Sequence, residues 1–196
     1  LASSLEIIVS EGFSALTMRR LAREIGMTAP NIYNYFANKD EIFITLNIKG
    51  FGDLILRLES EINAVSDPVQ RIRAFMTSYI KFGIENNRYY EIMFSLNAPK
   101  YHDYIGTEQE ALSIQGYDVS MQLVTLALSV IQDFANANEV KLDTKEASVN
   151  LSAIWSLLHG MVGLHNCNNM DFIVDDVESV YETIIDRVMA QIGVPF

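Results

Sequence analysis

The first forty residues hold three helix starts separated by very short turns, which confines this part of the chain to short helices in a compact unit. We expect a first helix from about Ala2 to Ser10, ended by Gly12. A second is expected to begin after Thr17, whose hydroxyl can accept a hydrogen bond from a first-turn amide. It is expected to stop at Gly26, because glycine tolerates the left-handed conformation of a sharp turn.

A third expected helix repeats this arrangement. Thr28 is its predicted cap, and Pro30 lies in the first turn, where a missing amide hydrogen does no harm. Ile32 and Phe36 are four residues apart and are therefore expected to share the buried face. Two short capped helices joined by a tight turn are typical of a helix-turn-helix, although helical hairpins without a DNA-binding role show the same spacing.

The opposite face of the third helix favours DNA over a plain hairpin. It is uncharged and rich in groups that recognise the edges of bases. The amides of Asn31 and Asn34 suit adenine, while Ala29 and Pro30 offer apolar contact to a thymine methyl group.

The net charge of −11 argues against nucleic acid, but the distribution of the charge does not. Residues 17–39 carry four basic side chains and one acidic side chain. We expect an acidic body that repels DNA everywhere except at this surface; the alternative is an ordinary solvated charged face.

The stretch from residue 16 to residue 39 resembles the DNA-binding signature of the TetR family. The match is gapless, covers about the first quarter of the chain, and includes Thr17, Leu21-Ala22, Gly26, Thr28, the Tyr33-x-x-Phe36 pair and Lys39. The resemblance implies an all-α protein with a three-helix helix-turn-helix DNA-binding domain over residues 1–46. A helical effector-binding and dimerisation domain is implied over residues 47–196.

The resemblance also implies roles for individual residues. Positions that face bases or the nearby backbone correspond to Ala29, Pro30, Asn31, Asn34 and Tyr35. Tyr33 and Lys39 correspond to phosphate contacts, and Thr17, Thr28 and Arg19 are further candidates for the DNA backbone. Tyr33 is alternatively a packing residue, and Arg20 and Arg23 are expected to be solvated.

The rest of the chain predicts further helices and no second module. Their expected ranges are 39–65, 67–86, 87–96, 108–137, 144–165 and 175–192, which makes about nine helices in all, with Pro99 in a loop.

The middle helices are rich in methionine and aromatic residues, a composition more typical of plain core but also suited to a small, mainly apolar effector. The pattern Trp155-x-x-x-His159-Gly160 resembles a motif of one TetR subclass, although His159 also fits a core partner. The predicted ligand-binding residues are Tyr79, Phe82, Phe94, Tyr117, Met121, Trp155 and His159.

The eighth and ninth helices predict a homodimer. The last helix has an apolar arc broad enough to bury two sides, one on its own domain and one on a partner. The eighth carries small residues that permit close helix approach, namely Ser152, Ser156, Gly160 and Gly163. The resemblance implies a two-fold, four-helix interface, which lets two reading heads meet successive major grooves of DNA, about 34–36 Å apart.

No catalytic, cofactor or metal site is predicted. The three histidines lie near no nucleophile-and-base motif, and no glycine-rich loop suggests a phosphate site. The spacing of His159, His165 and Cys167 does not suit a metal ion.

We expect a cytoplasmic protein without a membrane anchor. The single cysteine fits a reducing compartment, and no secretion signal precedes the first helix. The apolar runs at 123–131 and 153–164 are expected to be too short to cross a bilayer. Because Leu1 already lies in a helical pattern, an initiator methionine and a short leader are expected before it.

The expected function is a ligand-relieved repressor that binds a double-stranded, palindromic operator as a dimer. An effector among the middle helices would tilt the long helix that begins at Lys39 and so change the separation of the two heads. Three alternatives stand beside it: a transcriptional activator, a helical sensor whose head no longer reads DNA, and an enzyme.

Overall fold

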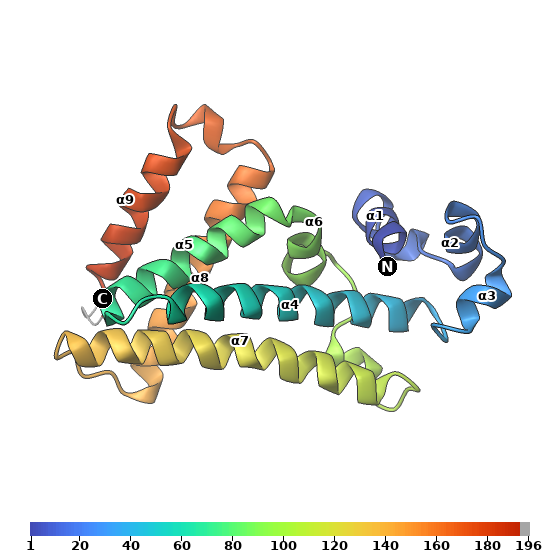
Figure 1. Ribbon diagram of the computed structural model, residues 1–196, viewed down its shortest axis with the longest axis horizontal. Helices are drawn as coiled ribbons and strands as arrows, with labels where there is room; N and C mark the ends of the chain where they lie inside the picture. Colours follow the sequence, from blue (N-terminus) through green and yellow to red (C-terminus); the bar gives the residue numbers. More distant parts are fainter. Residues whose placement is uncertain (193–196) are drawn as a thin grey trace. The chain divides into compact units, whose positions relative to one another are not determined.

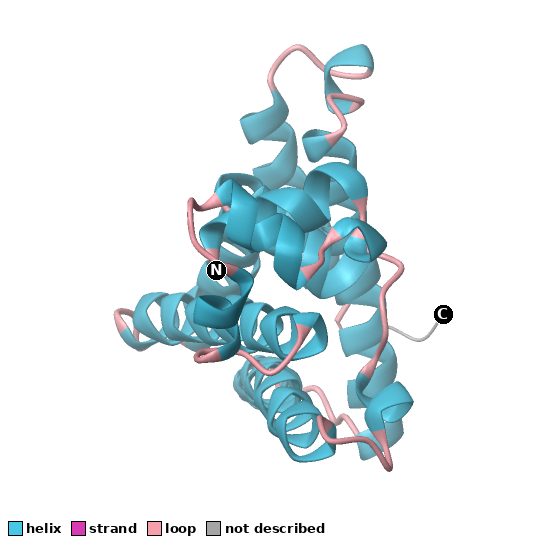
Figure 2. Ribbon diagram, turned by 90° about the vertical axis from the view of Figure 1, so that its right-hand side faces the viewer, coloured by secondary structure: helices cyan, strands magenta, loops and turns pink. Residues whose placement is uncertain are grey.

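The structure is a computed structural model that describes residues 1–192, and every regular element in this range is a helix (Figure 2). The nine α-helices of the described range are α1 (Ala2–Glu11), α2 (Met18–Glu24), α3 (Ala29–Tyr33), α4 (Lys39–Asn63), α5 (Pro68–Glu85), α6 (Asn87–Tyr90), α7 (Glu110–Ala137), α8 (Thr144–Asn166) and α9 (Val177–Met189) (Figure 1). The connections contain the short turns η1 (Phe13–Ala15), η2 (Glu91–Ser95), η3 (Tyr101–Tyr104) and η4 (Met170–Phe172). The all-α prediction is confirmed.

The helices form two compact units, which we describe separately. The first unit consists of residues 1–53 and 86–122, and the second consists of residues 54–85 together with the described residues from 123 onward. The predicted division into a DNA-binding domain (residues 1–46) and an effector-binding domain (residues 47–196) is a division by function, and it stays a prediction.

The core of the first unit joins α1, α2, α3 and the start of α4. Buried side chains from these helices form one cluster, and Ile92 of η2 completes it. Other members are Leu5, Ile8, Leu16, Leu21, Ile32, Ile42 and Leu46. The short helices are thus held by shared burial, because helices of this length are unstable alone in water.

The turns between these helices follow the predicted glycines. Gly12 and Gly26 have φ angles of 87° and 67°, in the region that favours glycine. The hydroxyl of Thr17 accepts a hydrogen bond from the backbone N–H of Arg20 at 3.1 Å, which confirms the predicted cap of α2.

The predicted side-chain cap at Thr28 is wrong, since its hydroxyl makes no capping hydrogen bond. Pro30 explains this result. A cap hydroxyl bonds to the second or third amide of the helix, and the second position here is Pro30, which has no N–H. The third amide, of Asn31, donates to the backbone carbonyl of Thr28 at 3.1 Å instead.

Two predicted connections differ from the structure. The helix expected over residues 87–96 ends as α6 at Tyr90 and continues as the wider π-turn η2. Pro99 lies in a loop, as predicted, but the turn η3 that follows it and the turn η1 were not predicted.

In the second unit α5 packs against α8 and α9 (Figure 1). Polar contacts tie α5 to its neighbours: Arg71 Nη1 lies 3.0 Å from Asp133 Oδ2 of α7, and the Asn166 side chain of α8 donates to the Gly83 carbonyl at 3.1 Å. Arg73 of α5 pairs with Asp186 of α9. One face of α9 is buried through Tyr181, Ile185 and Met189.

By length and composition alone, α7 and α8 are each long and apolar enough to cross a bilayer, a test that core helices of soluble proteins also pass. The expectation that no membrane is involved stays a prediction. Only 22% and 28% of the most apolar windows of α7 and α8 are buried within the chain. Apolar helix faces left open in this way are also typical of a helix that packs against a second subunit.

Candidate functional site

The outward face of α3 is held in place by one buried residue. Ile32 is 4% exposed and belongs to the core of the first unit, and Ala29 packs against that core, so the remaining positions of this five-residue helix point to solvent. Pro30, Asn31 and Asn34 are exposed, and Ala29 is partly buried. The uncharged polar face predicted from the sequence is therefore accessible.

Both tyrosines of this region are on the surface. Tyr33 is 55% exposed and Tyr35 is 71% exposed, so neither is a core residue. The packing alternative for Tyr33 is not supported by this exposure. An exposed phenol ring offers an apolar face and a hydroxyl group to a partner that contacts α3.

Lys39 lies at the start of α4 and is oriented by an aromatic residue that the sequence analysis missed. Its ammonium group sits 4.2 Å from the centre of the Phe13 ring, and that ring contacts Phe43 with centroids 4.9 Å apart. The turn η1 places Phe13 there. A cation over an aromatic face gains about 0.5–1 kcal/mol at an exposed site, enough to favour one direction for the side chain.

The first turn of α4 is closed by its own side chains. Asn38 Oδ1 accepts from the Glu41 N–H at 3.0 Å, and the Glu41 carboxylate accepts from the Ala37 N–H at 2.5 Å. This arrangement fixes the backbone next to Lys39.

The arginines of α2 are not equivalent. Arg20, expected to be solvated, forms a two-pronged pair with Glu11, with Nη1 2.6 Å from Oε2. The hydrogen bonds from Arg20 lower the pKa of the Glu11 carboxyl below its usual value. Arg19 and Arg23 are exposed. The guanidinium groups of Arg19 and Arg23 therefore carry the open positive charge of this helix.

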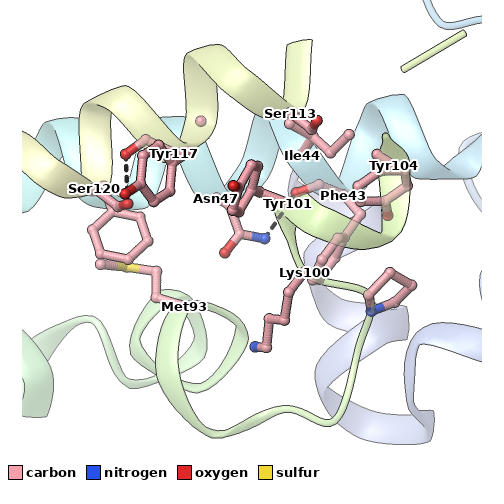
Figure 3. A pocket seen from close by; sticks show the side chains of 13 residues that line it. Phe43, Ile44, Asn47, Met93, Lys100, Tyr101, Tyr104, Ser113, Tyr117 and Ser120 are labelled. Carbon is pink, nitrogen blue, oxygen red and sulfur yellow. Dashed lines mark hydrogen bonds between the residues drawn. The ribbon is translucent and has the colours of Figure 1, made fainter. Parts of the chain in front are cut away.

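The first unit also contains a cavity of about 240 Å³ (Figure 3). Helix α4 contributes Phe43, Asn47 and Phe51 to its walls, and α7 contributes Tyr117 and Ser120. The remaining walls come from η2, η3 and the segment between them. Among the predicted ligand residues, Tyr117 lines this cavity.

The other predicted ligand residues are distributed over both units. Phe94 belongs to the first unit, where its ring lies 5.3 Å from that of Phe51, and Met121 lies further along α7. Tyr79, Phe82, Trp155 and His159 belong to the second unit.

The Trp155–His159 motif is anchored on α5. The Trp155 indole N–H donates to the hydroxyl of buried Tyr79 at 2.9 Å, and the Trp155 and His159 rings lie 6.2 Å apart. Burial lowers the pKa of the His159 imidazole below its ordinary value of 6.5, which favours the neutral ring. Within residues 1–192, no three His, Cys, Asp or Glu side chains come together as a metal site.

Comparison with known proteins identifies the family. The family model described as bacterial regulatory proteins, tetR family, matches residues 1–46, and that described as tetracyclin repressor-like, C-terminal domain, matches residues 72–188. The chain belongs to the TetR family. It is a transcriptional regulator with a DNA-binding helix-turn-helix and a ligand-binding domain, and not an enzyme.

Three known proteins are similar to this TetR-family chain. The HTH-type transcriptional activator FasR of Mycolicibacterium smegmatis is 23% identical over 115 residues, which are 59% of this chain and 50% of that protein. The fatty acid metabolism regulator protein of Bacillus subtilis is 25% identical over 77 residues, 39% of this chain and 40% of that protein. The matched region thus spans half or less of the length of either relative.

The third similar protein shows the fold. The structure of the transcriptional regulator FadR from Bacillus subtilis in complex with stearoyl-CoA has a TM-score of 0.70 to this chain at 15% identity. The match covers 100% of this chain and 96% of FadR. At this identity the likeness establishes a shared TetR-family fold.

Proposed function

We propose that this TetR-family chain is a cytoplasmic, ligand-relieved repressor that binds a palindromic operator as a homodimer, with α3 of each copy in the major groove. The observation that carries the proposal is the outward face of α3. Asn31 and Asn34 are exposed there beside Tyr35, while Ile32 locks the helix to the core. An uncharged amide-bearing face on a rigid support is suited to reading base edges.

The surrounding residues supply the sequence-independent part of binding. Lys39 and Tyr33 contact phosphates in this proposal, with Thr17, Thr28 and Arg19 as further backbone contacts. Both Lys39 and Arg19 are positively charged, whereas the whole chain carries −11. Repulsion of DNA by the acidic remainder would help to confine contact to this surface.

The homodimer uses α8 and α9 in this proposal. On α8, Val149, Leu157 and Leu164 are exposed apolar side chains, and Gly160 lies on the same side. On α9 the face next to the buried one carries a half-buried apolar stripe, formed by Val177, Val180, Ile184 and Val188. Two such stripes, otherwise left in water, gain stability by packing against a second copy.

The effector of this proposal is a mainly apolar small molecule with an acyl chain. One relative is named a fatty acid metabolism regulator, and one neighbour in fold holds stearoyl-CoA. Binding would tilt α4, whose first residue is Lys39, and so move the two reading heads apart. Such coupling is typically about 1–3 kcal/mol, or roughly 5–150-fold in DNA affinity.

Activation of transcription is a second candidate, because the relative FasR is named an activator. The two candidates differ in the outcome of operator binding and not in the binding itself. Transcription in vitro from the bound promoter, with and without the protein, distinguishes them: a fall supports repression and a rise supports activation.

Operator binding tests the assignment of α3. The DNA flanking the protein's own gene serves as the probe, with a random duplex of equal length as competitor. Asn34→Ala or Tyr35→Ala is expected to reduce the preference for the operator, by about 1–3 kcal/mol for a lost base contact. Lys39→Ala is expected to weaken operator and random DNA alike and to flatten the salt dependence by about one unit of slope.

Lys81→Ala, an exposed lysine of α5, is the matched control and is expected to leave both affinities unchanged. If Asn34→Ala and Lys39→Ala reduce specific and random binding by equal factors, α3 does not read the sequence.

A further inference from the structure

The cavity of the first unit combines aromatic walls with a single charge. Phe43 and Phe51 of α4 and Tyr117 of α7 line its interior, with Met93 of η2 beside them. Among the described residues that line the cavity, Lys100 is the one with a charged side chain. Walls of this kind fit a ligand that is apolar along most of its length and anionic at one point.

The ammonium group of Lys100 is available to such a ligand. Asp103 of η3 accepts from the Lys100 backbone N–H at 2.7 Å, and Asp40 of α4 accepts from the Tyr104 hydroxyl at 3.1 Å. Among residues 1–192, no ion pair involves the Lys100 side chain. In Figure 3 the side chains of Lys100, Asn47 and Met93 border one open space.

Asn47 adds a neutral polar group to the same space. One hydrogen of its amide is used within α4, donated to the Phe43 carbonyl at 3.0 Å. The other hydrogen and the amide oxygen remain to orient a polar atom of a ligand.

We propose that this cavity binds the head-proximal part of an anionic amphiphile, with its carboxylate or phosphate on the Lys100 ammonium and its first apolar carbons against Phe43, Phe51 and Met93. The proposal rests on the ligand response proposed above and names the chemistry of the effector. The size of the cavity sets the probe. At about 240 Å³ it is smaller than the roughly 300–1,000 Å³ usual for drug-sized ligands, so it suits an eight-carbon chain or part of a longer one.

A ligand in this cavity would touch the elements that hold the DNA-binding head. Met93 lines the cavity, and its neighbour Ile92, 1% exposed, is part of the core shared by α1, α2 and α3. On the opposite wall, Tyr104 donates its hydrogen bond to Asp40, the residue after Lys39. Burial raises the pKa of Tyr104, so its phenol stays protonated and keeps this bond at neutral pH.

Calorimetric titration with three eight-carbon probes tests the head group. Octanoate carries a carboxylate, octyl phosphate carries a phosphate directly on its alkyl chain, and 1-octanol is neutral. At least one anionic probe is expected to bind more tightly than 1-octanol, and Lys100→Met is expected to weaken that probe at least tenfold. The loss should be smaller in Lys100→Arg, and Lys141→Met, an exposed lysine outside the cavity, should leave binding unchanged.

Binding of octanoate identifies a carboxylate head, and binding of octyl phosphate alone identifies a phosphate head; either supports the proposal. It is overturned if neither anionic probe binds, if 1-octanol binds as tightly, or if Lys100→Met leaves the affinity unchanged.

A pair of serine variants tests the location. Ser120 lines the cavity, whereas Ser129 is exposed further along α7, and each hydroxyl donates to the carbonyl three residues before it, at 2.7 and 2.8 Å. Ser120→Phe fills the cavity and is expected to abolish probe binding, while Ser129→Phe is expected to preserve it. Equal binding by the two variants places the ligand elsewhere.

Operator binding, measured without ligand, distinguishes a failure of the cavity proposal from a failure of the proposed function. A protein that binds the operator but none of the anionic probes overturns the cavity proposal alone. A protein that binds octanoate or octyl phosphate through Lys100 but has no preference for operator DNA overturns the proposed function alone.

Discussion

One proline decides how α3 begins. Thr17 and Thr28 both precede helices, but only the Thr17 hydroxyl caps one: after Thr28 the second helical position is Pro30, which has no N–H, and the third N–H bonds to a backbone carbonyl. The amide of Asn31 is satisfied by the carbonyl of Thr28 instead. Thr17 and Thr28 each precede a helix, but they are therefore expected to contribute differently to the free energy of unfolding.

We predict that Thr17→Ala destabilises the protein more than Thr28→Ala. The first substitution removes a cap worth about 1 kcal/mol, with an observed range of about 0.5–2, and the second removes a hydroxyl that caps nothing. Urea unfolding followed by circular dichroism measures both free energies. Equal losses would show that the Thr28 hydroxyl is engaged after all.

At the scale of elements, the close approach of η2 to α4 depends on Gly50. A Cβ atom at this position would lie 2.6 Å from Met93 Sδ and 3.2 Å from the Tyr89 ring. Gly52, two residues later in the same helix, has no atom within 4 Å of such a Cβ. The present positions of the Met93 and Tyr89 side chains therefore leave no room for a Cβ at residue 50, whereas residue 52 has room for one.

We predict opposite effects for Gly50→Ala and Gly52→Ala. Alanine in a helix is favoured over glycine by up to about 1 kcal/mol, so Gly52→Ala should raise the free energy of unfolding. Gly50→Ala has the same gain but must displace Met93, and overpacking costs about 1–3 kcal/mol. Thermal and urea unfolding check the signs; a stabilising Gly50→Ala would mean that η2 moves aside freely.

The elements differ in how far the sequence determines them. Glycines and caps mark the ends of α1, α2 and α4, and the apolar spacing of Ile32 and its neighbours fixes which side of α3 is buried. The π-turn has no such marker in the sequence, and in the structure it lies where Met93 packs closely against Gly50 of α4.

The two candidate sites differ in the same way. The DNA-reading face is local: one short helix contains its residues, so its exposure could be predicted from spacing alone. The cavity gathers α4, η2, η3 and α7, and helical periodicity cannot distinguish Phe43 or Phe51 beside a cavity from the same residues in a filled core. Phe13, which orients Lys39, was missed because it lies in a turn without periodicity.

At the scale of the whole molecule, the proposed interface explains an otherwise unfavourable helix. Most of the residues that α8 turns away from Ile154, Leu158 and Met161 are exposed, including the apolar Leu157 and Leu164. A reader of palindromic DNA needs two heads at a fixed separation, and a rigid interface between copies provides it. In this proposal the need for two heads at a fixed separation explains both the open face of α8 and the role of α3.

We predict that Gly160→Leu converts a dimer into a monomer without unfolding the chain. Within one copy nothing lies within 4 Å of a Cβ at Gly160, so the new side chain has room there and helix propensity favours it. Between two copies the same side chain would separate helices that approach closely at glycine. Light scattering after size exclusion measures the change, with Ala111→Leu at an exposed position of α7 as control. Operator affinity should fall with the dimer, because each half-site then binds alone; a Gly160→Leu protein that keeps a two-chain mass and full operator affinity would place the interface away from this face of α8.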